Sequence, residues 1–219
     1  MRIYLVRHGE STWNGQQRIQ GRSNPSLSAR GLQQSAAVAR RLRRLPVDRL
    51  VTSPLRRARQ TAEAVGRSVG KRIEIAPELA EIALGEWEGL TSQMVDRRYN
   101  GRYQRWLAAP SATRVPGAET IAAFRRRVAR AFQRLIVDAD GAKQLCLVTH
   151  GGVITAILSE IWQADFDRLL IQLRLDNTGV TLIEAEGQRQ YVMYVNDTSH
   201  LNGRARAMSP VPFPRPSSR

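Results

Sequence analysis

The first fourteen residues, MRIYLVRHGESTWN at 1–14, hold a short apolar run that ends in Arg7-His8-Gly9. Two later apolar runs, at 50–52 and 145–148, also stop abruptly, the second of them before Thr149-His150-Gly151. In an open α/β sheet, ligand sites form outside the carboxyl ends of the strands. If the three runs are parallel strands, two of the chain's three histidines meet at one edge of the sheet.

The residues after these runs have the chemistry of a phosphate site. An imidazole nitrogen can take a phosphoryl group and pass it to water, so one hard displacement becomes two easier ones. We expect His8 to be this nucleophile, and it must be unprotonated to attack. Guanidinium groups match the geometry of phosphate, so we expect Arg7 and an arginine after the second run to hold the phosphate oxygens. Their charges also disfavour the imidazolium form of His8.

The charge of the chain is strongly basic, with a formal net charge of +15 over 219 residues. Of its 34 basic residues, all but Lys71 and Lys143 are arginines, many of them in doublets within helical patterns. A basic surface attracts nucleic acid, anionic membranes or anionic metabolites. Because no nucleic-acid recognition motif accompanies the arginines, we favour solvated helix faces over nucleic-acid binding.

The remaining composition bounds the class of protein. No apolar run approaches the length of a membrane span, and the first residues read as a strand rather than a signal peptide. The single cysteine, Cys146, cannot form an internal disulfide and lies in an apolar run. We therefore expect a buried, unreactive thiol and a cytoplasmic protein without membrane association.

Helical and strand patterns alternate along the chain. Ser28 is expected to cap a helix that runs to about Leu45, and Ser53-Pro54 is expected to start a second helix that Gly66 closes. Apolar spacing predicts the longest helix at about 119–137, and a further helix after Gly152. The first helix is expected to bury Leu32, Ala36, Ala39 and Leu42, and two late strands are expected at 179–184 and 191–195. Such alternation favours helices on both faces of a mostly parallel sheet.

Six ordered blocks resemble the histidine phosphatase superfamily, which includes cofactor-dependent phosphoglycerate mutases and many small-molecule phosphatases. The blocks are RHGESTWN at 7–14, QGRSNPSLSARG at 20–31, SPLRRARQTA at 53–62, ELAEIALGEWEGL at 78–90, VPGAET at 115–120 and VTHGG at 148–152. The resemblance implies an α/β fold, a three-layer α/β/α sandwich with a mostly parallel central sheet. It places this domain at 1–198, with a helical insertion at about 91–115 over the active site. The stretch 199–219, which has four prolines and four arginines, reads as a tail.

The resemblance also assigns roles to single residues. Arg57 is chosen among neighbouring arginines because it holds the fifth place in SPLRRARQTA. His150 is implied to donate a hydrogen bond to the phosphate and to steady the phosphorylated His8. Glu81, by its place in ELAEIALGEWEGL, is implied to be the general acid that protonates the leaving alcohol and then activates water. The residues expected to bind substrate are Asn14, Gln20, Gly21, Gly151 and His200.

His200 has two interpretations. Metal-independent phosphoserine phosphatases of the superfamily are similar in using a histidine near the C-terminus for substrate recognition. A solvated loop histidine explains the residue equally well. His200 therefore points to phosphoserine only as one candidate beside sugar phosphates, phosphoglycerate derivatives and α-ribazole phosphate.

The compact stretch between Gly89 and Pro116 distinguishes the branches of the superfamily. The mutases carry a longer basic and proline-rich segment there, so this chain looks like the phosphatase branch. We expect a metal-independent phosphomonoesterase, without cofactor, acting on a small phosphorylated metabolite. Pairing as a homodimer is a frequent arrangement in the superfamily. No metal-ligand spacing and no GxxxxGK[ST] loop is present in the sequence. The alternatives are a cofactor-dependent phosphoglycerate mutase and a catalytically inactive basic binding protein on the same fold.

Overall fold

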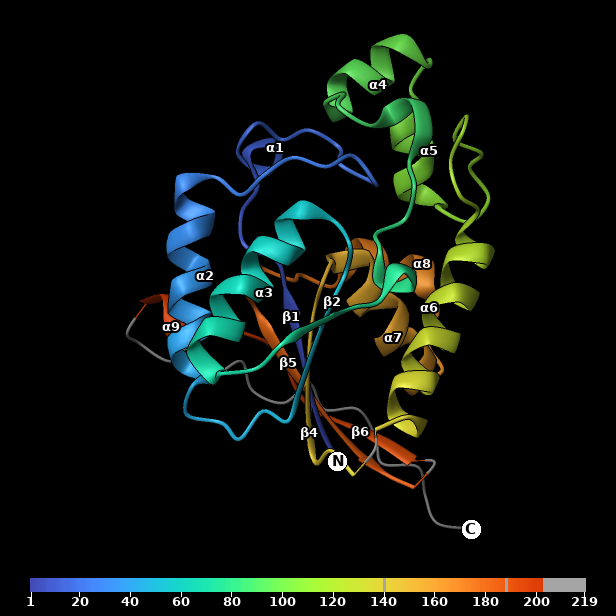
Figure 1. Ribbon diagram of the computed structural model, residues 1–219. Coiled ribbons are helices and arrows are strands. Elements are labelled where there is room, and N and C mark those ends of the chain that lie inside the picture. The colour runs from blue at the N-terminus through green and yellow to red at the C-terminus, as the bar shows by residue number, and fades with distance from the viewer. Residues whose placement is uncertain (140, 188, 203–219) are drawn as a thin grey trace.

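The computed structural model describes residues 1–139, 141–187 and 189–202, and these form one sheet with helices on both faces (Figure 1). The six strands lie in the order β3-β2-β4-β1-β5-β6. The first four of these are mutually parallel, and β5 and β6 add an antiparallel edge. The mostly parallel sheet is thus confirmed. The strands are β1 Arg2–Arg7, β2 Arg49–Thr52, β3 Ile73–Ile75, β4 Gln144–Thr149, β5 Val180–Glu186 and β6 Arg189–Asp197.

Two helix layers cover the sheet and complete the three-layer sandwich. Successive side chains of a strand point to opposite faces, and β1 accordingly divides its apolar residues between two cores. Ile3 and Leu5 pack with α6 and α7, whereas Tyr4 and Val6 pack with α2 and α3. The helices are α1 Thr12–Gly15, α2 Ala29–Leu42, α3 Arg56–Val69, α4 Ser92–Arg98, α5 Arg102–Ala108, α6 Ile121–Val137, α7 Gly151–Trp162, α8 Phe166–Gln172 and α9 Ser199–Asn202, with 3-10 turns at Pro77–Leu79 and Gly85–Trp87.

The insertion has a small core of its own. Trp87, Val95 and Val115 are buried there, and the rings of Tyr103 and Trp106 lie 6.1 and 6.4 Å from the Trp87 ring. Figure 1 shows α4 and α5 beyond the carboxyl ends of the parallel strands. The predicted helical insertion is therefore present at the end of the sheet where the site was expected.

The buried face of α2 differs from the predicted one. Leu32 is 54% exposed and Ala36 is also exposed, so these two predictions are wrong, whereas Ala39 and Leu42 are buried as expected. The cause is a close backbone approach: a Cβ at Gly31 would lie 1.9 Å from the Glu10 carbonyl oxygen. The buried face therefore begins with Gly31 and Ser35, and Leu32 lies beside it.

The start and end of α3 also differ from the prediction. The helix begins at Arg56, and its N-cap residue is Leu55, which makes no side-chain capping bond. The hydroxyl of Ser53 lies before the N-cap residue, where it accepts from the backbone N–H of Leu55 at 3.3 Å and lies 2.6 Å from Nε2 of His150. Gly66 lies within the helix, and Gly70, with φ of +69°, ends it in the left-handed conformation that glycine adopts readily.

The other expected elements agree with the structure to within a few residues. The longest described helix is α6, and α7 follows the His150 turn. Cys146 is fully buried, and burial raises the pKa of its thiol to about 12. The first four residues of the predicted tail form α9, and 203–219 lie outside the described residues. Within the described part of the chain, no helix is long and apolar enough to cross a bilayer.

We expect Leu147→Ala in β4 to lower the free energy of unfolding by about 2–5 kcal/mol, because it leaves a cavity in a fully buried position. Leu32→Ala, made as the matched control, is expected to change it by less than about 0.5 kcal/mol. Urea-induced unfolding measures both. Equal effects of the two substitutions would contradict this assignment of core and surface.

Candidate active site

The two histidines meet because β1 and β4 are adjacent parallel strands. Their register pairs Arg7 with Thr149, so the next residue in each chain segment is a histidine. The backbone N–H of His8 donates to the Thr149 carbonyl at 2.9 Å, which extends the ladder to the site. The two imidazole rings lie edge to face with centroids 5.1 Å apart, and both side chains are buried.

The tautomer of His8 follows from its hydrogen bonds. Nδ1 lies 2.7 Å from the carbonyl oxygen of Gly9, which can only accept, so Nδ1 carries the proton. Nε2 therefore has the free lone pair, and it accepts a 3.1 Å hydrogen bond from Nε of Arg57. Burial, and next the charges of Arg57 and Arg7, hold the pKa of His8 well below its ordinary value. The ring is thus a neutral imidazole with its nucleophilic nitrogen facing a cation.

Arg57 projects from the first turn of α3 and is 1% exposed. Its two terminal nitrogens donate to the carbonyls of Ser23 and Gly21, at 2.8 and 2.9 Å. These neutral acceptors fix the guanidinium plane and leave its charge uncancelled. Burial, opposed in part by the charge of Glu81, lowers the pKa of Arg57 to about 10, so the group stays charged at neutral pH.

Two buried nitrogens near His8 have no partner among the described residues: Nε of Arg7 and Nδ1 of His150. A terminal nitrogen of Arg7 donates to the Leu175 carbonyl, and Nε2 of His150 is joined to the hydroxyl of Ser53. Buried polar groups normally find a hydrogen-bond partner. These two unpaired nitrogens beside the nucleophile are therefore candidate donors to the oxygens of a bound phosphate.

Glu81 is held by backbone N–H groups at the wall of the same cavity. Its carboxylate accepts from Ile82 at 2.9 Å and from Gly152 at 3.0 Å. A Cβ at Gly152 would lie 2.4 Å from this carboxylate, so only glycine allows the approach. Arg127 fixes the chain on either side, since its guanidinium donates to the carbonyls of Ala80 at 2.8 Å and of Glu81 at 3.3 Å.

These groups surround a cavity of about 320 Å³. Arg7, His8, Arg57 and Glu81 line it together with the predicted Gln20, Gly21 and Gly151, whereas His150 reaches it only through its contact with His8. The remaining wall is mostly apolar, and among the described residues no further lysine or arginine lines it. The other lining residues are Ile19, Ile82, Leu84, Trp87, Tyr103, Trp106, Gly152, Thr155, Leu170, Leu173 and Leu175.

Two predicted substrate contacts do not line this cavity. The Oδ1 of Asn14 accepts from the backbone N–H of Ser11 at 3.0 Å, in the capping box of α1. His200 lies 3.1 Å from the Thr178 hydroxyl, and the backbone N–H of Thr178 donates to the Arg7 carbonyl at 2.9 Å. Both side chains hold loops that carry the site, and neither forms part of the cavity wall.

Two residues that position the site, Ser53 and Glu88, were not predicted to do so from the sequence. Glu88 accepts from the backbone of Ser23 at 2.7 Å and from its hydroxyl at 2.6 Å, and so fixes the loop whose carbonyls hold Arg57. Its place in ELAEIALGEWEGL was visible, but nothing in the spacing distinguishes it from Glu78 or Glu86. As for metals, the described residues contain no group of three or more His, Cys, Asp or Glu side chains that could hold an ion.

All three histidines should remain neutral at pH values where an ordinary histidine is half protonated. Burial is the first cause at each; it holds the pKa values of His8 and His150 well below 6.5 and lowers that of His200 to about 4. Between those values and about 6.5 the unfolded chain binds more protons, so the free energy of unfolding falls as the pH falls. Ring NMR signals measured against pH should show no histidine titrating near 6.5, whereas the urea-unfolded chain should show all three. A folded-state midpoint at or above 6.5 would contradict this description.

Comparison with known proteins agrees with this geometry. The model of the histidine phosphatase superfamily (branch 1) matches residues 3–198. A protein of Hydrogenobacter thermophilus (strain DSM 6534 / IAM 12695 / TK-6) named "Putative phosphoserine phosphatase 2" is 30% identical over 91% of this chain and 97% of its own length. "Probable phosphoglycerate mutase GpmB" of Salmonella choleraesuis (strain SC-B67) is 30% identical over 94% of this chain and 97% of its own length. The solved structure of Bacillus stearothermophilus YhfR has a TM-score of 0.85 at 30% identity, over 91% of this chain and 98% of that one. The chain is therefore an enzyme of the histidine phosphatase superfamily, branch 1.

Proposed function

We propose that the enzyme hydrolyses small phosphomonoesters through a phosphohistidine at Nε2 of His8. The observation that carries this proposal is the hydrogen bond from Nδ1 of His8 to the Gly9 carbonyl, at 2.7 Å. It leaves the lone pair on the nitrogen that Arg57 contacts. A neutral imidazole fixed in this tautomer is a nucleophile that needs no general base for the first step.

In the first step, Nε2 of His8 attacks phosphorus and the bond from phosphorus to the ester oxygen breaks. Glu81 transfers its proton to the leaving oxygen, so the product is a neutral alcohol. In the second step, Glu81 takes a proton from water as the water oxygen attacks phosphorus and the P–N bond breaks. Inorganic phosphate leaves, and His8 and Glu81 return to their initial protonation states.

The cations stabilise charge on the transferred group. The hydrogen bond from Nε of Arg57 to His8 opens for attack, and phosphate oxygens offer that N–H a stronger, anionic acceptor. The unpaired Nε of Arg7 and Nδ1 of His150 supply two further contacts. Because phosphoryl transfer depends mainly on positioning and charge stabilisation, these residues are sufficient without a metal ion.

The cavity wall favours a particular class of alcohol. Once Arg7 and Arg57 hold the phosphate, no other cationic side chain from the described part of the chain lines the cavity to meet a carboxylate on the substrate. Trp106, Leu170 and Leu173 instead offer apolar surface. We infer that the alcohol carries an uncharged apolar or aromatic group, since such a group gains free energy by leaving water.

Phosphoserine is a second candidate, favoured by the name of the Hydrogenobacter relative. Its carboxylate and ammonium would meet Gln20 and Thr155, the neutral polar side chains on the wall. The name of the Salmonella relative similarly makes phosphoglycerate mutase activity a further candidate. An inactive binding protein is disfavoured, because Arg7, His8, Arg57 and Glu81 line one cavity and His150 contacts His8.

The test is phosphate release from 2-phenylethyl phosphate, L-phosphoserine and 3-phosphoglycerate, with EDTA present. The first two are alkyl esters of similar intrinsic reactivity, so their kcat/KM ratio reports the cavity wall. We expect 2-phenylethyl phosphate to be the better substrate, and His8→Ala to lose activity by about a thousandfold or more. Faster release from phosphoserine would favour the second candidate, and isomerisation of 3-phosphoglycerate without release would indicate a mutase. Turnover that EDTA abolishes, or that His8→Ala retains, would reject the mechanism.

Gly152→Ala should impair proton donation more than phosphoryl binding, because the new methyl group displaces the Glu81 carboxylate. We expect kcat for 2-phenylethyl phosphate to fall by about a hundredfold. The fall should be much smaller for p-nitrophenyl phosphate, whose leaving group needs no proton. Gly15→Ala, whose Cβ would meet only ordinary contact at 3.9 Å, is the control and should leave both rates unchanged. Equal losses with the two esters would show that Glu81 is not the acid.

A further inference from the structure

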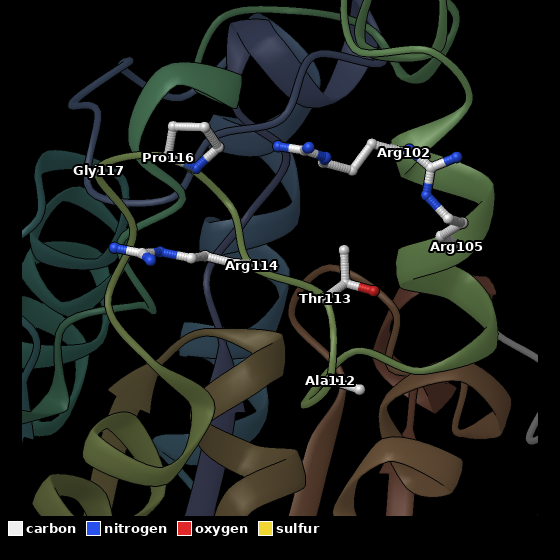
Figure 2. Close-up of a pocket in the computed structure, with 7 residues that line it drawn as sticks. All are labelled: Arg102, Arg105, Ala112, Thr113, Arg114, Pro116 and Gly117. Carbon is white, nitrogen blue, oxygen red and sulfur yellow. The ribbon is translucent and has the colours of Figure 1, made fainter.

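A second cavity, of about 590 Å³, lies in the insertion between α5 and the segment at 112–117 (Figure 2). None of its lining residues lines the active-site cavity, and a third cavity, which shares Arg114 with the first and Trp106 with the second, lies between them. Its volume is within the range of cavities that hold small molecules. The lining residues are Arg102, Arg105, Ala112, Thr113, Arg114, Pro116 and Gly117.

The charge of this cavity is entirely positive. Three arginines line it and no carboxylate does. The cavity at the other end of the sheet provides a contrast, because Arg49 and Lys71 share it with Asp48, Glu74 and Asp138. Glu119 lines the adjoining cavity that shares Arg114, but its carboxylate is paired with Arg22 and Arg127. An anion entering the insertion cavity therefore meets cations that have no acidic partner among the described residues.

The three guanidiniums are also free of ion pairs elsewhere in the described chain. The nine ion pairs of the described residues all use other arginines. Arg105 donates to the backbone carbonyl of Asn100 at 2.8 Å, a neutral acceptor that leaves its charge in place. For the guanidiniums of Arg102 and Arg114, the described residues offer no hydrogen-bond partner. Figure 2 shows Arg102 reaching from α5 toward Pro116, across the cavity from the segment that carries Arg114.

From these observations we propose an accessory site in the insertion for a small phosphate-bearing metabolite, bound by Arg102, Arg105 and Arg114. Guanidinium presents paired N–H donors that match phosphate oxygens, and it binds them more strongly than a neutral donor does. Ala112 and the ring of Pro116 provide apolar surface for the remainder of the molecule. A phosphorylated small molecule therefore fits the wall in both its charged and its uncharged part.

The accessory site shares a helix with the active site. Helix α5 carries Arg102 and Arg105 into the accessory cavity, and it carries Tyr103 and Trp106 into the wall of the active-site cavity. An anion that orders the two arginines therefore restrains the apolar wall against which the substrate packs. The accessory ligand is thus placed to affect substrate affinity without touching the reacting groups.

Calorimetric titration of the full chain with inorganic phosphate tests the proposal, at about 0.15 M salt, where exposed charges are screened beyond about 8 Å. We expect two equivalents to bind to the wild type. In the double variant Arg102→Ala/Arg114→Ala, the second equivalent should bind about tenfold more weakly or not at all. Arg57→Ala should instead weaken phosphate binding at the active site and leave binding in the insertion unchanged. A failure of the active-site proposal is therefore distinguishable from a failure of this one.

The matched control is Arg43→Ala/Arg44→Ala, which removes two exposed charges from the end of α2. It should bind phosphate as the wild type does. Hydrolysis of p-nitrophenyl phosphate by the insertion variant shows that the variant folds. Equal phosphate binding by the insertion variant and the wild type, or an equal loss in the control, would overturn the proposal. Unchanged phosphate binding with weakened DNA binding in the insertion variant would overturn it in favour of a nucleic-acid surface.

Discussion

The parallel pairing of β1 with β4 is the contact on which the rest of the site depends. Its register sets Arg7 opposite Thr149, and the hydrogen bond from His8 N–H to the Thr149 carbonyl extends that pairing to the histidines. A slip of one residue would turn every buried side chain of β1 to the opposite face. The two apolar cores, which take alternate residues of β1, thus fix the geometry of the chemistry at its end.

Burying cations beside neutral imidazoles costs free energy. Hydrogen bonds to backbone carbonyls and the charges of nearby carboxylates offset this cost. Arg57 donates to two backbone carbonyls, and the charges of Glu81 and Glu88 favour its protonated form. Neither carboxylate forms an ion pair with it in the described chain. The charged groups that lower the pKa of His8 are Arg57 and Arg7, which favour a phosphate dianion and disfavour protonation of the nucleophile.

Local patterns predicted the sheet and the two histidines at its edge, because a strand that ends in Arg-His-Gly can be recognised within ten residues. The insertion was predicted from the resemblance to the superfamily. The failures arose where a distant partner decides. Ser53 has the chemistry of a helix cap, yet its hydroxyl bonds to His150, 97 residues away. Leu32 has helical spacing with Leu42, but the buried face of α2 begins at Gly31, against which the Glu10 backbone packs. His200 contacts Thr178 instead of the cavity, which no spacing within 196–200 could indicate.

The arginine surplus, expected to form solvated helix faces, divides into groups with different functions. Arg127 comes from one of the arginine runs, yet its guanidinium donates to three backbone carbonyls and to both oxygens of Glu119. A lysine has three donors on one nitrogen and could not reach acceptors spread over 78–81 and Glu119. The demand for a wide, planar set of donors therefore explains arginine at this position on physical grounds. Arg102 and Arg114 make no such contacts, so their charge is left for a ligand rather than for the fold.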